Sequence, residues 1–147
     1  MAPAAAPKPI DPRGPRFNQA VITVLLLAGF VADWRVLVPA VAVVVGSGAA
    51  FGPRWNPFLA LYGEVLRPRL RPPAELEDPR PPRFAAAMGA AVLALATLVF
   101  VLGNVILGWV LALLVAVMAG LAASSGICIG CEIYLFLARR RGIPAAS

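Results

Sequence analysis

Cys128 and Cys131 are the residues of this sequence whose type and spacing could carry chemistry. They are the only two cysteines in the chain, and random placement would give a Cys-x-x-Cys spacing about one time in a hundred. Residues three apart on a helix share a face, so the two sulfurs can reach each other or one soft metal ion. A thiol in the first turn of a helix also feels the positive end of the helix dipole, which lowers its pKa and raises its thiolate fraction.

This pattern favours thiol–disulfide or sulfane-sulfur exchange with a partner, with Cys128 and Cys131 as the catalytic residues. Metal binding is a second interpretation, but zinc and iron–sulfur sites use four ligands and the sequence has no histidine, so a dimer or a partner would have to complete the site. A third interpretation is a pair of inert cysteines that pack a helix. The nearby Glu132 and an apolar environment would both weigh against an activated thiol. The sequence itself assigns no metal ligand and no cofactor.

The composition places these cysteines in a membrane protein. Hydrophobic residues make up 61% of the chain and charged residues 14%, whereas a soluble domain carries about 25% charged residues. The net charge of +6 does not indicate nucleic-acid binding, because the arginines flank apolar runs instead of forming one patch with interleaved aromatic residues. No charged residue lies in the middle of an apolar run, which argues against an ion-coupled carrier.

Four apolar runs have about the length that a helix needs to cross a bilayer, which is roughly 17–25 residues for about 30 Å of hydrocarbon. The predicted spans cover about residues 17–33, 36–52, 84–102 and 105–124. Only two residues separate the last two spans, so a tight antiparallel hairpin is expected there. The predicted fold class is all-α: an integral membrane four-helix bundle built from two transmembrane hairpins.

The segments outside the spans complete the predicted organisation. The boundaries are a disordered, proline-rich tail at 1–16, a single membrane domain at 17–138 and a basic cytoplasmic tail at 139–147. In the central loop, Asn56 is a candidate N-cap and Pro57 the first residue of an amphipathic interfacial helix at 57–67. The cysteines are expected on a short helix at 126–138. The alternative is that the fourth span continues, tilted, and carries them into the bilayer.

The basic residues predict how the chain is oriented. One side of the predicted bundle holds twelve of them: Lys8, Arg13, Arg16, Arg54, Arg67, Arg69, Arg71, Arg80, Arg83, Arg139, Arg140 and Arg141. The other side holds only Arg35, which Asp33 balances. Because cytoplasmic loops carry the excess of Lys and Arg, we expect a multi-pass cell-membrane protein with both termini in the cytoplasm and the Cys-x-x-Cys at the cytoplasmic membrane interface.

Several segments together match a known pattern. They are Asp11-Pro12-Arg13-Gly14-Pro15-Arg16-Phe17, Arg67-Pro68-Arg69-Leu70, Pro73-Ala74-Glu75-Leu76-Glu77-Asp78-Pro79, Pro82-Arg83-Phe84-Ala85 and Gly126-Ile127-Cys128-Ile129-Gly130-Cys131-Glu132-Ile133-Tyr134. On these segments, which extend over roughly residues 11–138, the chain resembles the bacterial membrane protein family catalogued as domain of unknown function 4395. The resemblance implies a multi-span protein of the bacterial inner membrane. Some members look to be encoded near or fused with thioredoxin-like or rhodanese-like proteins, which implies a partner of that kind.

The function predicted from the sequence is that of a membrane-embedded thiol redox or sulfur-relay component, an accessory to thiol–disulfide exchange or sulfur transfer. A non-catalytic membrane scaffold or assembly subunit with structural cysteines is the alternative from a different class. The expected partners are the lipid bilayer and a thioredoxin-like or rhodanese-like protein, and nucleic acid is not expected.

Overall fold

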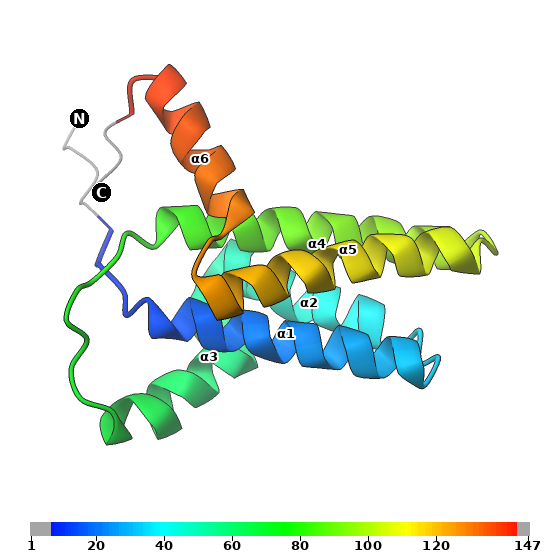
Figure 1. Cartoon of the computed structure of the whole chain (residues 1–147), viewed down its shortest axis with the longest axis horizontal. Helices are drawn as coiled ribbons and strands as arrows, with labels where there is room; N and C mark the ends of the chain where they lie inside the picture. Colours follow the sequence, from blue (N-terminus) through cyan, green and yellow to red (C-terminus); the bar gives the residue numbers. More distant parts are fainter. Residues whose placement is uncertain (1–6, 144–147) are drawn as a thin grey trace.

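The computed structural model describes residues 7–143, and helices account for most of them (Figure 1). The α-helices are α1 (Arg13–Val31), α2 (Leu37–Phe51), α3 (Pro57–Leu61), α4 (Arg80–Val101), α5 (Val105–Ser125) and α6 (Ile129–Arg140). Three short helical segments surround α3: the 3-10 turns η1 (Pro53–Trp55) and η3 (Arg67–Arg69), and the π-helical η2 (Tyr62–Leu66). Within residues 7–143, the one β-type pairing is an isolated antiparallel bridge between Ile10 and Glu77.

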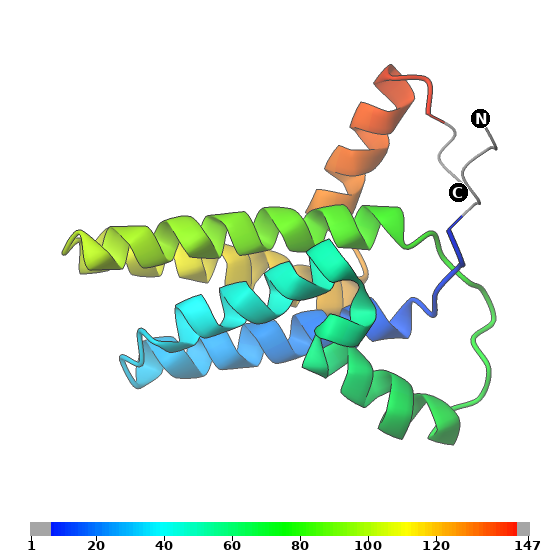
Figure 2. The ribbon, with the colours of Figure 1, turned by 180° about the vertical axis from the view of Figure 1, so that it is seen from behind.

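Four of these helices form an antiparallel bundle (Figures 1 and 2). The helices α1 and α5 pack against each other, α2 packs against α4, and α4 packs against α5. Three of the four, α1, α4 and α5, have the length and apolar composition of membrane spans, with 19, 22 and 21 residues. The fourth, α2, is apolar but has only 15 residues. The predicted all-α membrane bundle is confirmed, with three long apolar helices and one shorter one.

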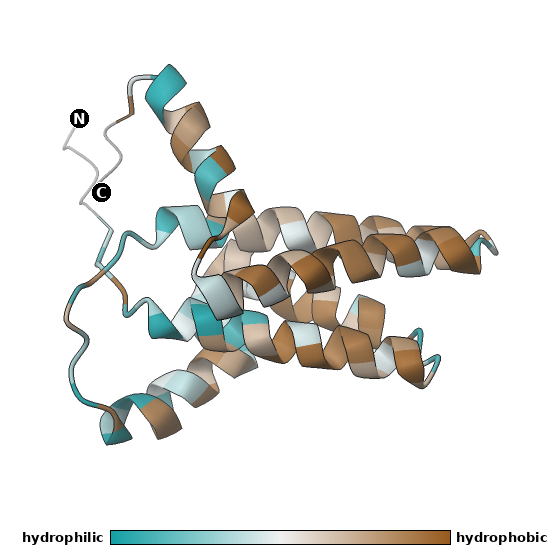
Figure 3. Ribbon diagram, viewed as in Figure 1, coloured by the Kyte–Doolittle hydropathy of each residue, from teal (hydrophilic) through white to brown (hydrophobic). Residues whose placement is uncertain are grey.

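The polar and apolar parts of the bundle are separated along its length (Figure 3). Apolar residues cover most of the four helices, whereas polar residues gather at the end of the bundle where α1 and α4 begin and α5 ends, next to the projecting α3 and α6. We call this the basic end. The opposite end, with the turns at 32–36 and 102–104, is the loop end.

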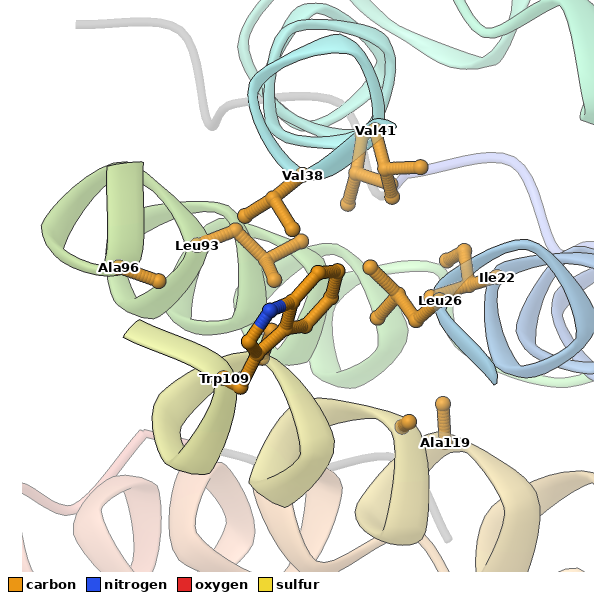
Figure 4. Close-up of a cluster of buried hydrophobic side chains, with 11 residues drawn as sticks. Ile22, Leu26, Val38, Val41, Leu93, Ala96, Trp109 and Ala119 are labelled. Atoms are coloured by element: carbon orange, nitrogen blue, oxygen red, sulfur yellow. The ribbon is translucent and has the colours of Figure 1, made fainter. Parts of the chain in front are cut away.

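The core of the bundle is close-packed towards the loop end (Figure 4). Trp109 is only 7% exposed, and its ring makes edge-on contacts with Phe30 and Phe100. Its indole N–H donates a hydrogen bond of 3.2 Å to Asp33 Oδ1 in the turn between α1 and α2. Apart from Trp109, the buried residues of α5 are small, which lets the neighbouring helices approach it closely. These are Gly108, Ala112, Ala116, Ala119 and Ala122.

Two helices begin earlier than the sequence predicted. Residues 13–16, predicted to belong to the disordered tail, form the first turn of α1, and α4 begins at Arg80 instead of residue 84. In both cases an aspartate caps the backbone: Asp11 Oδ1 accepts the N–H of Arg13, and Asp78 Oδ1 accepts the N–H of Arg80, each at 2.9 Å. The prolines nearby are tolerated because first-turn N–H groups have no partner inside the helix. Residues 1–6 and 144–147 of the two predicted tails lie outside the described residues.

The chain contains an internal repeat that aligns its two halves. The motif Asp-Pro-Arg-x-Pro-Arg-Phe occurs at residues 11–17 and again at 78–84, and each copy starts the first helix of a hairpin. Each hairpin ends at a glycine with positive φ, Gly52 at 110° and Gly126 at 75°. After each glycine a short helix begins at an N-cap residue and projects from the basic end (Figure 1). We call residues 11–66 the first half and 78–140 the second half.

Side-chain contacts repeat as well. In the first half the Phe17 and Tyr62 rings lie 5.8 Å apart, and in the second half Phe84 and Tyr134 lie 5.5 Å apart, each pair in a tilted arrangement. These contacts hold the short helix of each half against the start of that half's first helix. The first helix of each half also packs on a helix of the other half: α1 packs on α5, and α4 packs on α2. The two halves thus form one structural unit.

Candidate thiol site

The backbone places the two cysteines at the start of α6. The helix α5 ends at Ser125, and the chain turns through Gly126 before α6 begins at Ile129. The cysteines therefore do not lie on a continuation of α5, and the alternative of one long fourth span is wrong. Cys128 is the N-cap of α6, with φ −99° and ψ 106°, and Cys131 lies in the first turn. Within the predicted 126–138 segment, residues 126–128 are thus a connection and not helix.

The N-cap position gives the Cys128 sulfur a specific partner. The backbone N–H of Cys131 donates to Cys128 Sγ at 3.3 Å, as a serine or aspartate oxygen would accept it in an ordinary N-cap. Both this N–H group and the helix dipole favour negative charge on that sulfur. Cys131 is not the N-cap residue, because it lies three residues further along the chain, inside α6. Cys128, and not Cys131, therefore occupies the N-cap position.

Both cysteines are half-buried and free. The pair is a dithiol, because no cross-link joins the two residues.

Two side chains of α1 lie beside this turn. Gln19 Nε2 is 3.8 Å from Cys128 Sγ, within the range of a hydrogen bond to sulfur. The Arg16 guanidinium lies against Gly126, since a Cβ on that glycine would be 2.6 Å from Arg16 Nη2. A cation and an amide donor both favour a thiolate. Glu132, the acidic neighbour in the sequence, is exposed on the first turn of α6.

Gly130, between the two cysteines, sets the position of α6 on α4. A Cβ at Gly130 would lie 2.6 Å from the Cβ of Ala85 and 2.9 Å from its Cα, so no larger residue fits without moving one of the helices. This close approach fixes the start of α6, and with it both sulfurs, against the first turns of α4.

A buried amide pair lies at the same end of the bundle. Asn56, 2% exposed, caps α3 as predicted: its Oδ1 accepts the N–H groups of Phe58 at 3.0 Å and Leu59 at 3.4 Å. Its Nδ2 donates to Asn18 Oδ1 on α1 at 3.0 Å. A buried amide without such partners would cost about 1–3 kcal/mol, so the bonds hold α3 in one place.

A second buried contact ties η2 to the start of the chain. The Tyr62 hydroxyl donates to Asp11 Oδ2 at 3.0 Å, and both residues are less than 9% exposed. Burial, together with the bond to Asp11, raises the pKa of Tyr62 above its usual value. The phenol is therefore neutral at physiological pH and serves as a donor.

A cavity of ≈ 1050 Å³ lies between the helices and reaches the thiol site. Its walls come from both halves and are mainly apolar, including the core residues Ile22, Val45 and Leu93. Its polar wall includes Asn18, Gln19 and Asn56 from the first half and Cys128 from the second. One thiol of the pair thus faces a space inside the bundle.

Sequence reasoning identified the cysteine pair and the Asn56 cap, but it missed the side chains that surround Cys128. The side chains of Asn18 and Gln19 bond to Asn56 and Cys128, and the sequence did not predict these contacts. The repeated Asp-Pro-Arg-x-Pro-Arg-Phe motif could have shown that Asn56 and Cys128 are equivalent positions, but not that α1 packs near α5 and α6. Within residues 7–143, no group of three or more His, Cys, Asp or Glu side chains could hold a metal ion.

Comparison with known proteins gives one assignment. No curated protein and no solved structure is significantly similar to the chain. The sequence pattern of one family matches residues 10–139, which is almost the whole chain and includes both copies of the repeat and the cysteine pair. This four-helix membrane protein belongs to the family described as Domain of unknown function (DUF4395).

Proposed function

We propose that this protein is a membrane-embedded thiol redox or sulfur-relay component that works through Cys128 and Cys131 at the cytoplasmic membrane interface. One observation carries the proposal: Cys128 caps a helix and accepts the N–H of Cys131 at 3.3 Å, with Arg16 and Gln19 on the adjoining side. These groups favour the thiolate, which is the reactive form in thiol–disulfide exchange.

In the proposed reaction Cys128 attacks first. Its thiolate displaces one sulfur of a partner disulfide, so that a mixed disulfide forms and a partner thiolate leaves. Cys131 then loses its proton and attacks the Cys128 sulfur, which forms the internal disulfide and releases the second partner thiolate. With a persulfide as donor, Cys128 takes the outer sulfur and the donor leaves as a thiolate. The partner we propose is a thioredoxin-like or rhodanese-like protein.

The distribution of charge supports the cytoplasmic placement. All of the twelve basic residues assigned to one side lie in the tails, in the central loop, or in the terminal turns of α1, α4 and α6. Arg35, at the loop end, is paired with Asp33 at 2.9 Å. By the positive-inside rule, the basic end faces the cytoplasm, and both termini and the thiol pair lie on that side.

Trapping the mixed disulfide tests this function. The full-length protein is reconstituted in lipid vesicles, reduced, and exposed to glutathione disulfide, and the products are identified by mass spectrometry. We expect an internal disulfide in the wild type, a stable glutathione adduct on Cys128 in Cys131→Ser, and little adduct in Cys128→Ser.

Two results would contradict the proposal. If neither cysteine reacts in the folded protein, the pair is structural and the protein is better described as a scaffold. If Cys128→Ser accumulates the adduct on Cys131 as fast as Cys131→Ser does on Cys128, the N-cap has no role in activating the thiol.

A further inference from the structure

We infer that the cavity between the two halves binds a lipid-soluble quinone, which accepts the two electrons of the Cys128–Cys131 dithiol. This inference rests on the proposed function and adds the electron acceptor to it. It is drawn from three properties of the cavity: its size, its walls, and the sulfur that faces it.

The cavity has the dimensions of a small-molecule site. Its ≈ 1050 Å³ is just above the range of about 300–1,000 Å³ that is usual for ligand pockets. Its apolar wall extends from the core residue Leu93 on α4 to Leu114 and Met118 on α5. Such walls suit an aromatic ring with a hydrocarbon tail, and the cavity lies among helices that are long and apolar enough to span a membrane, where lipid-soluble molecules are concentrated.

Besides charged side chains such as Arg54, Glu64 and Arg83, the polar wall contains amides that suit the carbonyl oxygens of a quinone. Asn18 uses its oxygen to accept from Asn56, so its amide N–H groups are the ones that can donate to a ligand. Gln19 and Cys128 lie on the same wall, with the Gln19 amide 3.8 Å from the sulfur. A quinone carbonyl that accepts from these amides would hold its ring next to Cys128.

The chemistry balances without a further reactant. The two thiols lose two protons and two electrons, and one S–S bond forms between Cys128 and Cys131. The quinone takes up both electrons and both protons, which form the two O–H bonds of the quinol. A lipid acyl chain could fill the same apolar walls, but it could not accept electrons or use the amide donors.

The test uses the reduced full-length protein in phosphatidylcholine vesicles under anaerobic conditions, with decylubiquinone as the probe. Quinone absorbance reports reduction, and alkylation of the remaining thiols reports oxidation of the protein. We expect one quinol to form for each pair of thiols lost. Ala86, which lines the cavity, is replaced by Phe to fill it, and the neighbouring Ala87, which is exposed and does not line it, is replaced by Phe as the control.

Ala86→Phe should slow quinone reduction by roughly tenfold or more, because a displaced reactant loses the alignment that the site provides. Ala87→Phe should react like the wild type. Oxidation by glutathione disulfide is measured in parallel, and an unchanged rate shows that the thiol site of Ala86→Phe is folded. Gly89→Leu is a second cavity-filling variant, at a position where a Cβ would meet only Val115 Cγ1, at 3.9 Å.

The outcomes separate the two proposals. If glutathione disulfide oxidises the pair and the quinone does not, the quinone site is wrong and the proposed function stands. If both cavity-filling variants reduce the quinone at the wild-type rate, the cavity is not the site. If neither oxidant reacts with the cysteines, both proposals fail.

Discussion

The two halves of this protein have the same architecture and different residues at one equivalent position. Each half starts with Asp-Pro-Arg-x-Pro-Arg-Phe, forms a helical hairpin and ends in a short helix held by a Phe–Tyr contact. The N-cap of that helix lies six residues before the tyrosine in both halves. In the first half it is Asn56, and in the second it is Cys128.

The two N-cap residues differ in burial, in hydrogen bonding and in the chemistry of their side chains. Asn56 is 2% exposed and makes three hydrogen bonds, to two backbone N–H groups and to Asn18. Cys128 is half-buried, and sulfur is a weak acceptor, so the same position contributes less to stability there. What the second half gains is a thiol at a helix N-terminus. At this equivalent position the first half thus has a buried structural amide, and the second half has the thiol that we propose to be reactive.

The largest expected effect on stability comes from removing the two caps in turn. Asn56→Ala loses a helix cap and a buried amide bond, and should lower the free energy of unfolding by about 2–3 kcal/mol. Cys128→Ala should lower it by less than about 1 kcal/mol. Unfolding of the full-length protein in detergent micelles, followed by circular dichroism, measures both. Equal losses of unfolding free energy in the two variants would contradict a larger structural role for Asn56 than for Cys128.

The sequence was sufficient for the parts of the fold that depend on local pattern. Uncharged apolar runs predicted the bundle, and Asn56 followed by Pro57 predicted the start of α3. The early start of α1 could not be predicted from its prolines alone, because the side chain of Asp11 supplies the cap. The break between α5 and α6 depends on Gly126, which adopts a left-handed conformation.

The surroundings of the thiols depend on contacts between residues far apart in the sequence. Gln19 and Cys128 are separated by 109 positions, and Asn18 and Asn56 by 38. No local pattern brings them together. Gln19 meets Cys128 because α1 packs on α5 and not mainly on its own hairpin partner, and Asn18 meets Asn56 because α3 packs against α1. The cysteine pair was therefore predictable, and the side chains that surround it were not.

The second arginine of each repeated motif gives a smaller and more selective test. Arg83 donates to the carbonyls of Ala49 and Ala50 at the end of α2, at 2.6 and 2.9 Å, so Arg83→Gln should destabilise the fold by about 1 kcal/mol. Its counterpart Arg16 lies beside Gly126 at the end of α5. Arg16→Gln should mainly slow alkylation of Cys128, by severalfold, because the thiolate loses a nearby cation. An unchanged alkylation rate in Arg16→Gln would remove Arg16 from the site.

The smallest expected effect comes from the two tyrosines. Tyr62→Phe removes the hydrogen bond to Asp11 and should cost up to about 1 kcal/mol, whereas Tyr134→Phe should change stability less. Because the folded state raises the pKa of Tyr62, the phenol stabilises the fold fully below about pH 10 and loses this contribution as the pH rises through the raised pKa. Unfolding measured from pH 8 to 12 should show this alkaline loss in the wild type and a smaller loss in Tyr62→Phe. Identical profiles would contradict the role of Tyr62.

The most direct test of the account is the rate at which each cysteine reacts with a membrane-impermeant maleimide. The reduced protein is labelled in inverted and in right-side-out membrane vesicles, and mass spectrometry follows Cys128 and Cys131 separately over time. We predict labelling from the cytoplasmic face, with Cys128 several times faster than Cys131 because it caps the helix. Labelling only from the opposite face, or Cys131 reacting first, would contradict the assignment of the basic end to the cytoplasm or of Cys128 as the nucleophile.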